Sequence, residues 1–72
     1  MTIEEAIKEI RKEMGLSQED LARALNISYT TINRWENKKA KPSRLAIIQL
    51  KEYCADKNLS DEITAVLKNT KY

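Results

Sequence analysis

The stretch that decides the fold is LSQEDLARALNISYTTINRWENKK, residues 16–39, in which one construction occurs twice. In each copy an apolar residue precedes a serine, and a helical pattern follows the serine. A serine at this position accepts a hydrogen bond from the free amides that open a helix. Ser17 and Ser28 are the two predicted caps, and Asn26 is predicted to close the first helix in a left-handed conformation. The chain must therefore turn sharply between two short helices.

So tight a turn predicts two steeply crossed helices, as in a helix-turn-helix unit. Leu21, Ala22 and Leu25 share one face of the first helix, and Ile32 and Trp35 share one face of the second. We expect these apolar faces to meet, which leaves the other side of the second helix outward. The residues expected on that outward side are Tyr29, Thr30, Asn33 and Arg34.

Residues 16–43 resemble the helix-turn-helix of the phage-repressor and Cro family, also called the xenobiotic-response-element type. The resemblance rests on Gln18, Leu21-Ala22, Leu25, Ile27-Ser28, Ile32, and Arg34-Trp35-Glu36-Asn37 followed by lysines and Pro42. It implies an all-α fold, namely a compact five-helix lambda-repressor-like DNA-binding domain. In that domain the second and third helices form the helix-turn-helix, and helix 29–36 enters the major groove of DNA.

The flanking sequence reads as the scaffold of one domain, residues 1–72. Thr2 and Glu5 form a predicted capping box, Gly15 is a predicted C-cap, and Ser43 and Ser60 are predicted to cap two further helices. The last helix is short and carries a few apolar side chains. We expect these side chains to form a dimer interface: Ile63, Val66 and Leu67.

Composition excludes several kinds of site. The chain has one cysteine, Cys54, and no histidine, so it can form no internal disulfide, no zinc site and no thiol–imidazole pair. It has no glycine-rich phosphate loop and no nucleophile–base set, so we expect neither an enzyme nor a bound cofactor. No apolar run approaches the roughly 20 residues of a membrane span. The sequence therefore predicts a cytoplasmic protein without a membrane segment.

The formal net charge of +2 is unevenly distributed. Residues 33–51 carry six cations and one anion, whereas residues 1–32 and 52–72 are each slightly acidic. A lysine-rich loop is usually only a solvated surface. Next to a polar helix of the right size for a groove, however, clustered cations are typical of a surface that binds duplex DNA.

Each outward residue of helix 29–36 has a chemical reason to contact a base. Arg34 can donate two hydrogen bonds to guanine, Asn33 can pair with adenine, and Thr30 offers a methyl group to thymine. Tyr29 could instead lie along the sugar-phosphate backbone, where it would add affinity without sequence information. The family resemblance favours Tyr29, Thr30 and Arg34 as the residues directed at bases.

A second set of residues is expected to contact the DNA backbone. Two of its members open helices, where they could hold a phosphate together with free amides or could merely cap. The others follow the second helix and are mostly cationic. The full set is Gln18, Ser28, Asn37, Lys38, Lys39, Lys41 and Arg44.

The resemblance also implies an ion pair and draws attention to two departures. In the family, an arginine of the first helix pairs with the glutamate that closes the recognition helix, and Arg11 and Glu36 hold those positions here. The alternative is an exposed pair that contributes little. Family members usually have glycine where this chain has Asn26 and Lys38. Lys38 would therefore either strain the loop by about 1 kcal/mol or adopt another turn.

These observations together predict a sequence-specific, double-stranded DNA-binding transcriptional regulator, repressor-like in its mode of action. A short helix contacts only a few base pairs, so we expect a homodimer on an inverted repeat. The alternative is a protein-interaction module of the same fold, such as an antitoxin that binds a toxin. The sequence specifies neither the operator nor the direction of regulation.

Overall fold

A serine or threonine caps the first turn of every helix in this computed structural model, which describes residues 1–70. The helices are α1 (Ile3–Met14), α2 (Gln18–Leu25), α3 (Tyr29–Glu36), α4 (Arg44–Cys54) and α5 (Asp61–Asn69). The cap hydroxyl accepts a hydrogen bond from the third amide of its helix, and the five caps are Thr2, Ser17, Ser28, Ser43 and Ser60. All five caps were predicted from the sequence. Residues 1–70 contain no strand, which confirms the all-α class.

Left-handed residues end the first three helices or follow them closely. Gly15 closes α1 with a φ of 68°, and Asn26 closes α2 with a φ of 58°, both as predicted. Lys38, which follows the end of α3 by two residues, has a φ of 59°. The loop therefore keeps the turn that a glycine would favour, although a lysine side chain is strained there.

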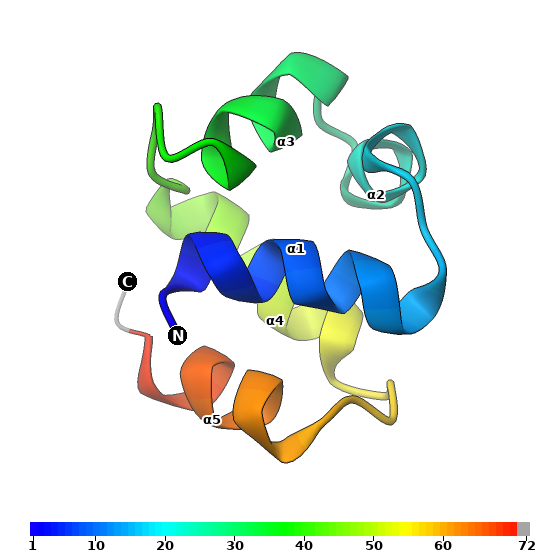
Figure 1. The fold of residues 1–72 in the computed structure, drawn as a ribbon, viewed down its shortest axis with the longest axis vertical. Coiled ribbons are helices and arrows are strands. Elements are labelled where there is room, and N and C mark those ends of the chain that lie inside the picture. The colour runs from blue at the N-terminus through cyan, green and yellow to red at the C-terminus, as the bar shows by residue number, and fades with distance from the viewer. Residues whose placement is uncertain (71–72) are drawn as a thin grey trace.

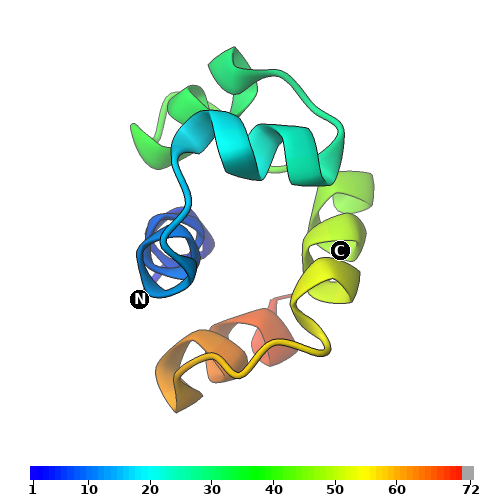
Figure 2. The ribbon, with the colours of Figure 1, turned by 90° about the vertical axis from the view of Figure 1, so that its right-hand side faces the viewer.

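The helices enclose one core between two ends of the molecule. α1 crosses the middle, α2 and α3 lie at one end, and α5 lies at the other (Figure 1). Turned by 90°, the structure shows α1 and α4 on opposite sides of this core (Figure 2). α2 packs on α3 and α4, while α1 packs on α3 and α5. The helix-turn-helix formed by α2 and α3 thus rests on both long helices.

The predicted apolar faces of α2 and α3 do meet. The side chains of Leu21, Ala22 and Leu25 are buried against those of Ile32 and Trp35, all within one core cluster. Trp35 is only 5% exposed, so it is a core residue. The fully buried large side chains of the domain are Ile7, Ile10, Leu21, Ile32, Leu50 and Ile63.

The expectation for the last helix was wrong for two of its three apolar residues. Ile63 is fully buried and Leu67 is 8% exposed, because α5 packs its apolar face on α1 within the same chain. Only Val66 of this set is partly exposed. The apolar face of α5 is therefore used mainly within its own chain.

An ion pair ties α1 to the end of α3. Arg11 donates from Nε to Oε2 of Glu36 over 2.8 Å and from Nη2 to Oε1 over 2.9 Å, and its Nη1 donates to the carbonyl of Leu16. The Glu36 side chain is only 4% exposed. Burial raises the pKa of Glu36, but hydrogen bonds from Arg11 and Gln18 and the nearby positive charges outweigh this effect, so the pKa lies below its ordinary value of 4.5.

Replacing Arg11 by methionine should destabilise the domain strongly. The substitution leaves the Glu36 carboxylate buried without its main partner, at an expected cost of about 1 to 3 kcal/mol. For a domain of this size each kcal/mol lowers the melting temperature by about 4 to 8 °C. Calorimetry or circular dichroism at neutral pH measures this shift. An unchanged melting temperature would show that the pair contributes nothing.

The matched control is Arg23→Met, because Arg23 pairs with Asp20 on the exposed surface of α2, where both side chains are at least 45% exposed. This control should shift the melting temperature by less than Arg11→Met does, because an exposed pair within a helix contributes little. At acid pH the difference in melting temperature between Arg11→Met and the unaltered chain should also become smaller. Glu36 has a lowered pKa in the folded protein, so its stabilising contribution is present above pH 4.5 and is lost as the pH falls.

Replacing Lys38 by glycine should stabilise the domain. Glycine adopts a φ of 59° without the steric cost that lysine bears, which is worth about 0.5 to 1 kcal/mol. We expect a rise of several degrees in melting temperature, by about 4 to 8 °C per kcal/mol. Asn26→Gly is the control. Asparagine tolerates the left-handed region better than lysine does, so this substitution should raise the melting temperature by less. A fall in melting temperature for Lys38→Gly would contradict the strain assigned to this residue.

Candidate nucleic-acid interface

The two faces of α3 differ sharply in exposure. Ile32 and Trp35 face the core, whereas Thr30 and Arg34 are exposed and Tyr29 is 49% exposed. α3 lies at one end of the longest axis of the molecule, so this outer face is not covered by another helix (Figure 1). Three of the four side chains predicted to read bases therefore lie together on an open surface.

The start of α3 is electrostatically suited to an anion. Its first turn contains no acidic residue, and neither does that of α4, whereas α1, α2 and α5 each carry two acids there. The free amides at a helix N-terminus carry a partial positive charge that an acidic side chain would offset. The Ser28 hydroxyl accepts from the amide of Thr31 over 3.1 Å and contacts its Oγ1 over 2.8 Å. Ser28 thus acts as a cap, and its predicted contact with DNA stays a prediction.

Most cations in and directly after the loop between α3 and α4, residues 37–43 (the cationic loop), are available to an outside partner. Lys39, Lys41 and Arg44 are exposed and form no ion pair with any residue that the structure describes. Arg34 reaches back over this loop, where its Nη2 lies 3.5 Å from the carbonyl of Lys39. A hydrogen bond of that length is weak, so the guanidinium remains free to take a better acceptor.

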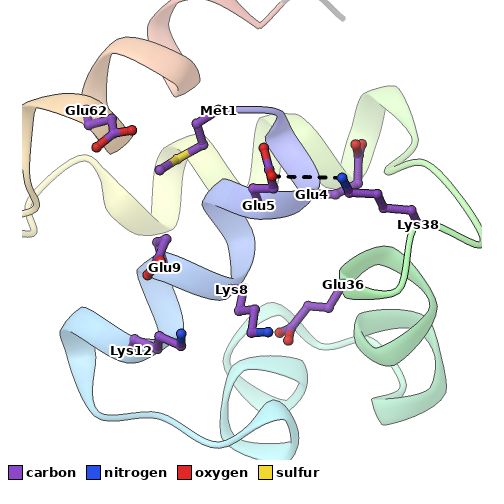
Figure 3. A pocket seen from close by; sticks show the side chains of 9 residues that line it. All are labelled: Met1, Glu4, Glu5, Lys8, Glu9, Lys12, Glu36, Lys38 and Glu62. Carbon is purple, nitrogen blue, oxygen red and sulfur yellow. Dashed lines mark ion pairs between the residues drawn. The ribbon is translucent and has the colours of Figure 1, made fainter.

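Lys38 is directed away from these cations. Its Nζ lies 3.8 Å from Oε2 of Glu5 on α1, and Figure 3 shows the side chain extended toward that helix. The groove beside it is lined by Met1, Glu4, Glu5, Lys8, Glu9, Lys12, Glu36, Lys38 and Glu62. Carboxylates outnumber ammonium groups in this lining. Lys38 therefore faces an acidic surface of the protein itself, and both side chains of its ion pair are at least half exposed.

Lys51 also lies apart from the cationic loop. It belongs to the basic segment of the sequence, but its Nζ donates to the carbonyl of Thr70 over 2.9 Å. This contact joins α4 to the end of α5. The charge of residues 33–51 is thus divided between a surface near α3 and contacts within the fold.

Gln18 and Asn33 are held in a polar network that the sequence did not reveal. Gln18 Nε2 donates to Oε1 of Glu36 over 3.1 Å, and Asn33 Nδ2 donates to Oε1 of Gln18 over 3.2 Å. Asn37 Nδ2 in turn donates to Oδ1 of Asn33 over 3.1 Å. Gln18 and Asn33 are 15 residues apart, and no local spacing rule links an amide on one helix with an amide on the next. Both are partly buried, unlike the other predicted contact residues.

The rest of the described chain offers little chemistry of other kinds. Burial raises the pKa of the Cys54 thiol to about 11, so it is protonated at neutral pH and a poor nucleophile. Within residues 1–70, acidic and cysteine side chains form no cluster that could hold a metal ion. None of the five helices is both long and apolar enough to cross a bilayer.

Comparison with known proteins agrees with this geometry. A family model described as helix-turn-helix matches residues 7–61. The chain is 32% identical over 57 residues to the uncharacterized HTH-type transcriptional regulator YiaG of Escherichia coli strain K12, and this segment is 79% of the chain and 59% of that protein. Proteins of the same name from strains O6:H1 and O157:H7 match equally well.

The chain thus spans about 59% of the length of the curated relatives that it matches. No solved structure is significantly similar to it. The matched residues 7–61 include all of α2, α3 and α4, together with Arg11 of α1. Because the family model covers more than half of the sequence, the chain belongs to the helix-turn-helix family of the xenobiotic-response-element type.

Proposed function

We propose that this chain is a sequence-specific, double-stranded DNA-binding transcriptional regulator, repressor-like, that inserts α3 into the major groove. The observation that carries the proposal is the outer face of α3, where Tyr29, Thr30 and Arg34 lie exposed at one end of the molecule. A helix with an open polar face fits the width of the major groove. The similarity to proteins named as transcriptional regulators supports the same assignment.

The exposed residues divide into two roles. Arg34 is suited to guanine, because its guanidinium can donate two parallel hydrogen bonds to the guanine edge, and Thr30 is suited to thymine. Tyr29, at the first position of α3, contacts a base or the adjoining sugar. Lys39, Lys41 and Arg44 attract phosphates and add affinity that does not depend on sequence.

The functional unit is proposed to be a homodimer on an inverted repeat. α3 has only eight residues and reads a few base pairs, which is too little information for a specific site. Two copies of α3 spaced by about one helical turn would double the length of the recognised sequence. Ile63 and Leu67 are buried in the protomer core, so we expect the interface to use mainly other surfaces.

Selection of bound sites from random duplex DNA tests this function. The unaltered chain should recover a motif of two half-sites related by a two-fold axis. Arg34→Ala should lose the preference for one base pair in each half-site, at a cost of about 1 to 3 kcal/mol on the original motif. The control is Lys68→Ala, since Lys68 is exposed on α5 at the opposite end of the molecule, and it should leave the motif unchanged.

Two outcomes would contradict the proposal. Recovery of no motif by the unaltered chain would favour a protein partner, as in the antitoxin alternative. A motif that survives Arg34→Ala without change would show that α3 does not read bases through this residue.

Lys39→Ala should change the salt dependence of binding and leave the base preference intact. Loss of one phosphate contact reduces the slope of log K against log salt concentration by about one. Titrations of a fixed duplex at several salt concentrations measure the slope, and Lys68→Ala again serves as the control. A relaxed base preference in Lys39→Ala would assign this residue to a base and not to the backbone.

A further inference from the structure

The amide side chains of Gln18, Asn33 and Asn37 form a single file across the helix-turn-helix. The file begins at the Glu36 carboxylate, passes through Gln18 at the start of α2 and Asn33 on α3, and ends at Asn37 beyond α3. Each link is a hydrogen bond of 3.1 or 3.2 Å. The first two amides are partly buried, and the last is exposed.

Glu36 fixes the direction of this file. An ionised carboxylate has only acceptors, so the amide group that faces it must be the N–H group of Gln18. The side-chain oxygen of Gln18 then faces Asn33, so Asn33 must donate an N–H group to it. The side-chain oxygen of Asn33 in turn accepts a hydrogen bond from Asn37. Arg11 holds the carboxylate in place through two further hydrogen bonds. A single charge therefore orients three amides.

This direction leaves N–H groups without a partner among the described residues. Each amide nitrogen carries two N–H groups, and the file uses one of them in each residue. The second N–H groups of Gln18 and Asn37 make no hydrogen bond within residues 1–70. Both residues lie at helix ends next to the open face of α3, and an N–H group without a partner is the donor that a phosphate oxygen requires.

We propose that Asn33 is a positioning residue that holds Gln18 and Asn37 with their N–H groups toward the DNA backbone, in a direction set by Glu36. Base reading then falls to the exposed residues Tyr29, Thr30 and Arg34. This inference rests on the proposed DNA-binding function and replaces the sequence-based expectation that Asn33 pairs with adenine. Asn33 forms hydrogen bonds with two protein side chains at once and is less exposed than the three base-reading residues. This arrangement suits a residue that positions its neighbours better than one that contacts a base.

The first test compares Asn33→Ala with Thr30→Ala on DNA. Asn33→Ala should weaken binding to the selected motif and to an unrelated duplex by the same factor, about three- to tenfold, because a lost hydrogen bond is worth roughly that much. The base preference found by selection should not change. Thr30→Ala should instead relax the preference at one base pair. A base preference that relaxes in Asn33→Ala would make Asn33 a reader and overturn the proposal.

Coupling between the amides gives a second readout. If Asn33 acts through Gln18, the double variant Gln18→Ala, Asn33→Ala should bind little more weakly than the weaker-binding of the two single variants. Two independent contacts with DNA would give losses that multiply. Multiplying losses would therefore overturn the positioning role.

The third test uses the free protein and needs no DNA. In ¹⁵N-edited NMR spectra, Asn33→Ala should shift the side-chain amide resonances of Gln18 and Asn37 while the backbone resonances of α1 and α5 stay in place. Asn69→Ala removes an exposed amide from α5 and should leave the Gln18 resonances unchanged. Unmoved Gln18 and Asn37 resonances in Asn33→Ala would overturn the inference.

The failures of the two proposals are distinguishable. An unaltered chain that binds no duplex overturns the DNA-binding function and the phosphate role together, whatever the spectra show. If the unaltered chain selects a motif but the side-chain amide resonances of Gln18 and Asn37 do not shift in Asn33→Ala, only the positioning role is overturned.

Discussion

The buried carboxylate of Glu36 is the contact on which the placement of α3 depends. α3 has eight residues and buries only Ile32 and Trp35, so it is too short to be stable alone and takes its position from its neighbours. Arg11 reaches Glu36 from α1, and Gln18 reaches it from α2. One side chain at the end of α3 thus receives donors from both preceding helices, which fixes α3 in rotation as well as in distance.

Local features of the fold were predictable because they depend on short spacings. The five hydroxyl caps, the left-handed Gly15 and Asn26, and the apolar faces of α2 and α3 all follow from residues three or four positions apart. The family resemblance added the order of the helices. One local feature was not predicted: Asp20 completes a capping box with Ser17. The usual capping-box pattern has glutamate or glutamine, not aspartate, at that position.

Contacts between helices were harder to foresee. The apolar face of α5 was visible in the sequence, but periodicity does not say whether such a face covers its own core or a partner. The contact of Ser60 with Glu13 joins residues 47 positions apart, over 2.9 Å between the Ser60 amide and the Glu13 carboxylate. Among the candidate contact residues, the direction of Lys38 toward Glu5 and the links of Gln18 and Asn33 depend on crossing angles that no single segment encodes.

The acidic residues in the first turns of the helices are unevenly distributed, and this affects how well each helix start is stabilised. Acids in the first turns of α1, α2 and α5 each stabilise their helix dipole by about 0.3 to 1 kcal/mol, and α3 and α4 lack this contribution. The two helices that border the cationic loop therefore have no negatively charged side chain in the first turn to offset the partial positive charge of their free amides. An anion at these two helix starts would supply the missing counter-charge, so it would stabilise α3 and α4 as the first-turn acids stabilise the other three helices.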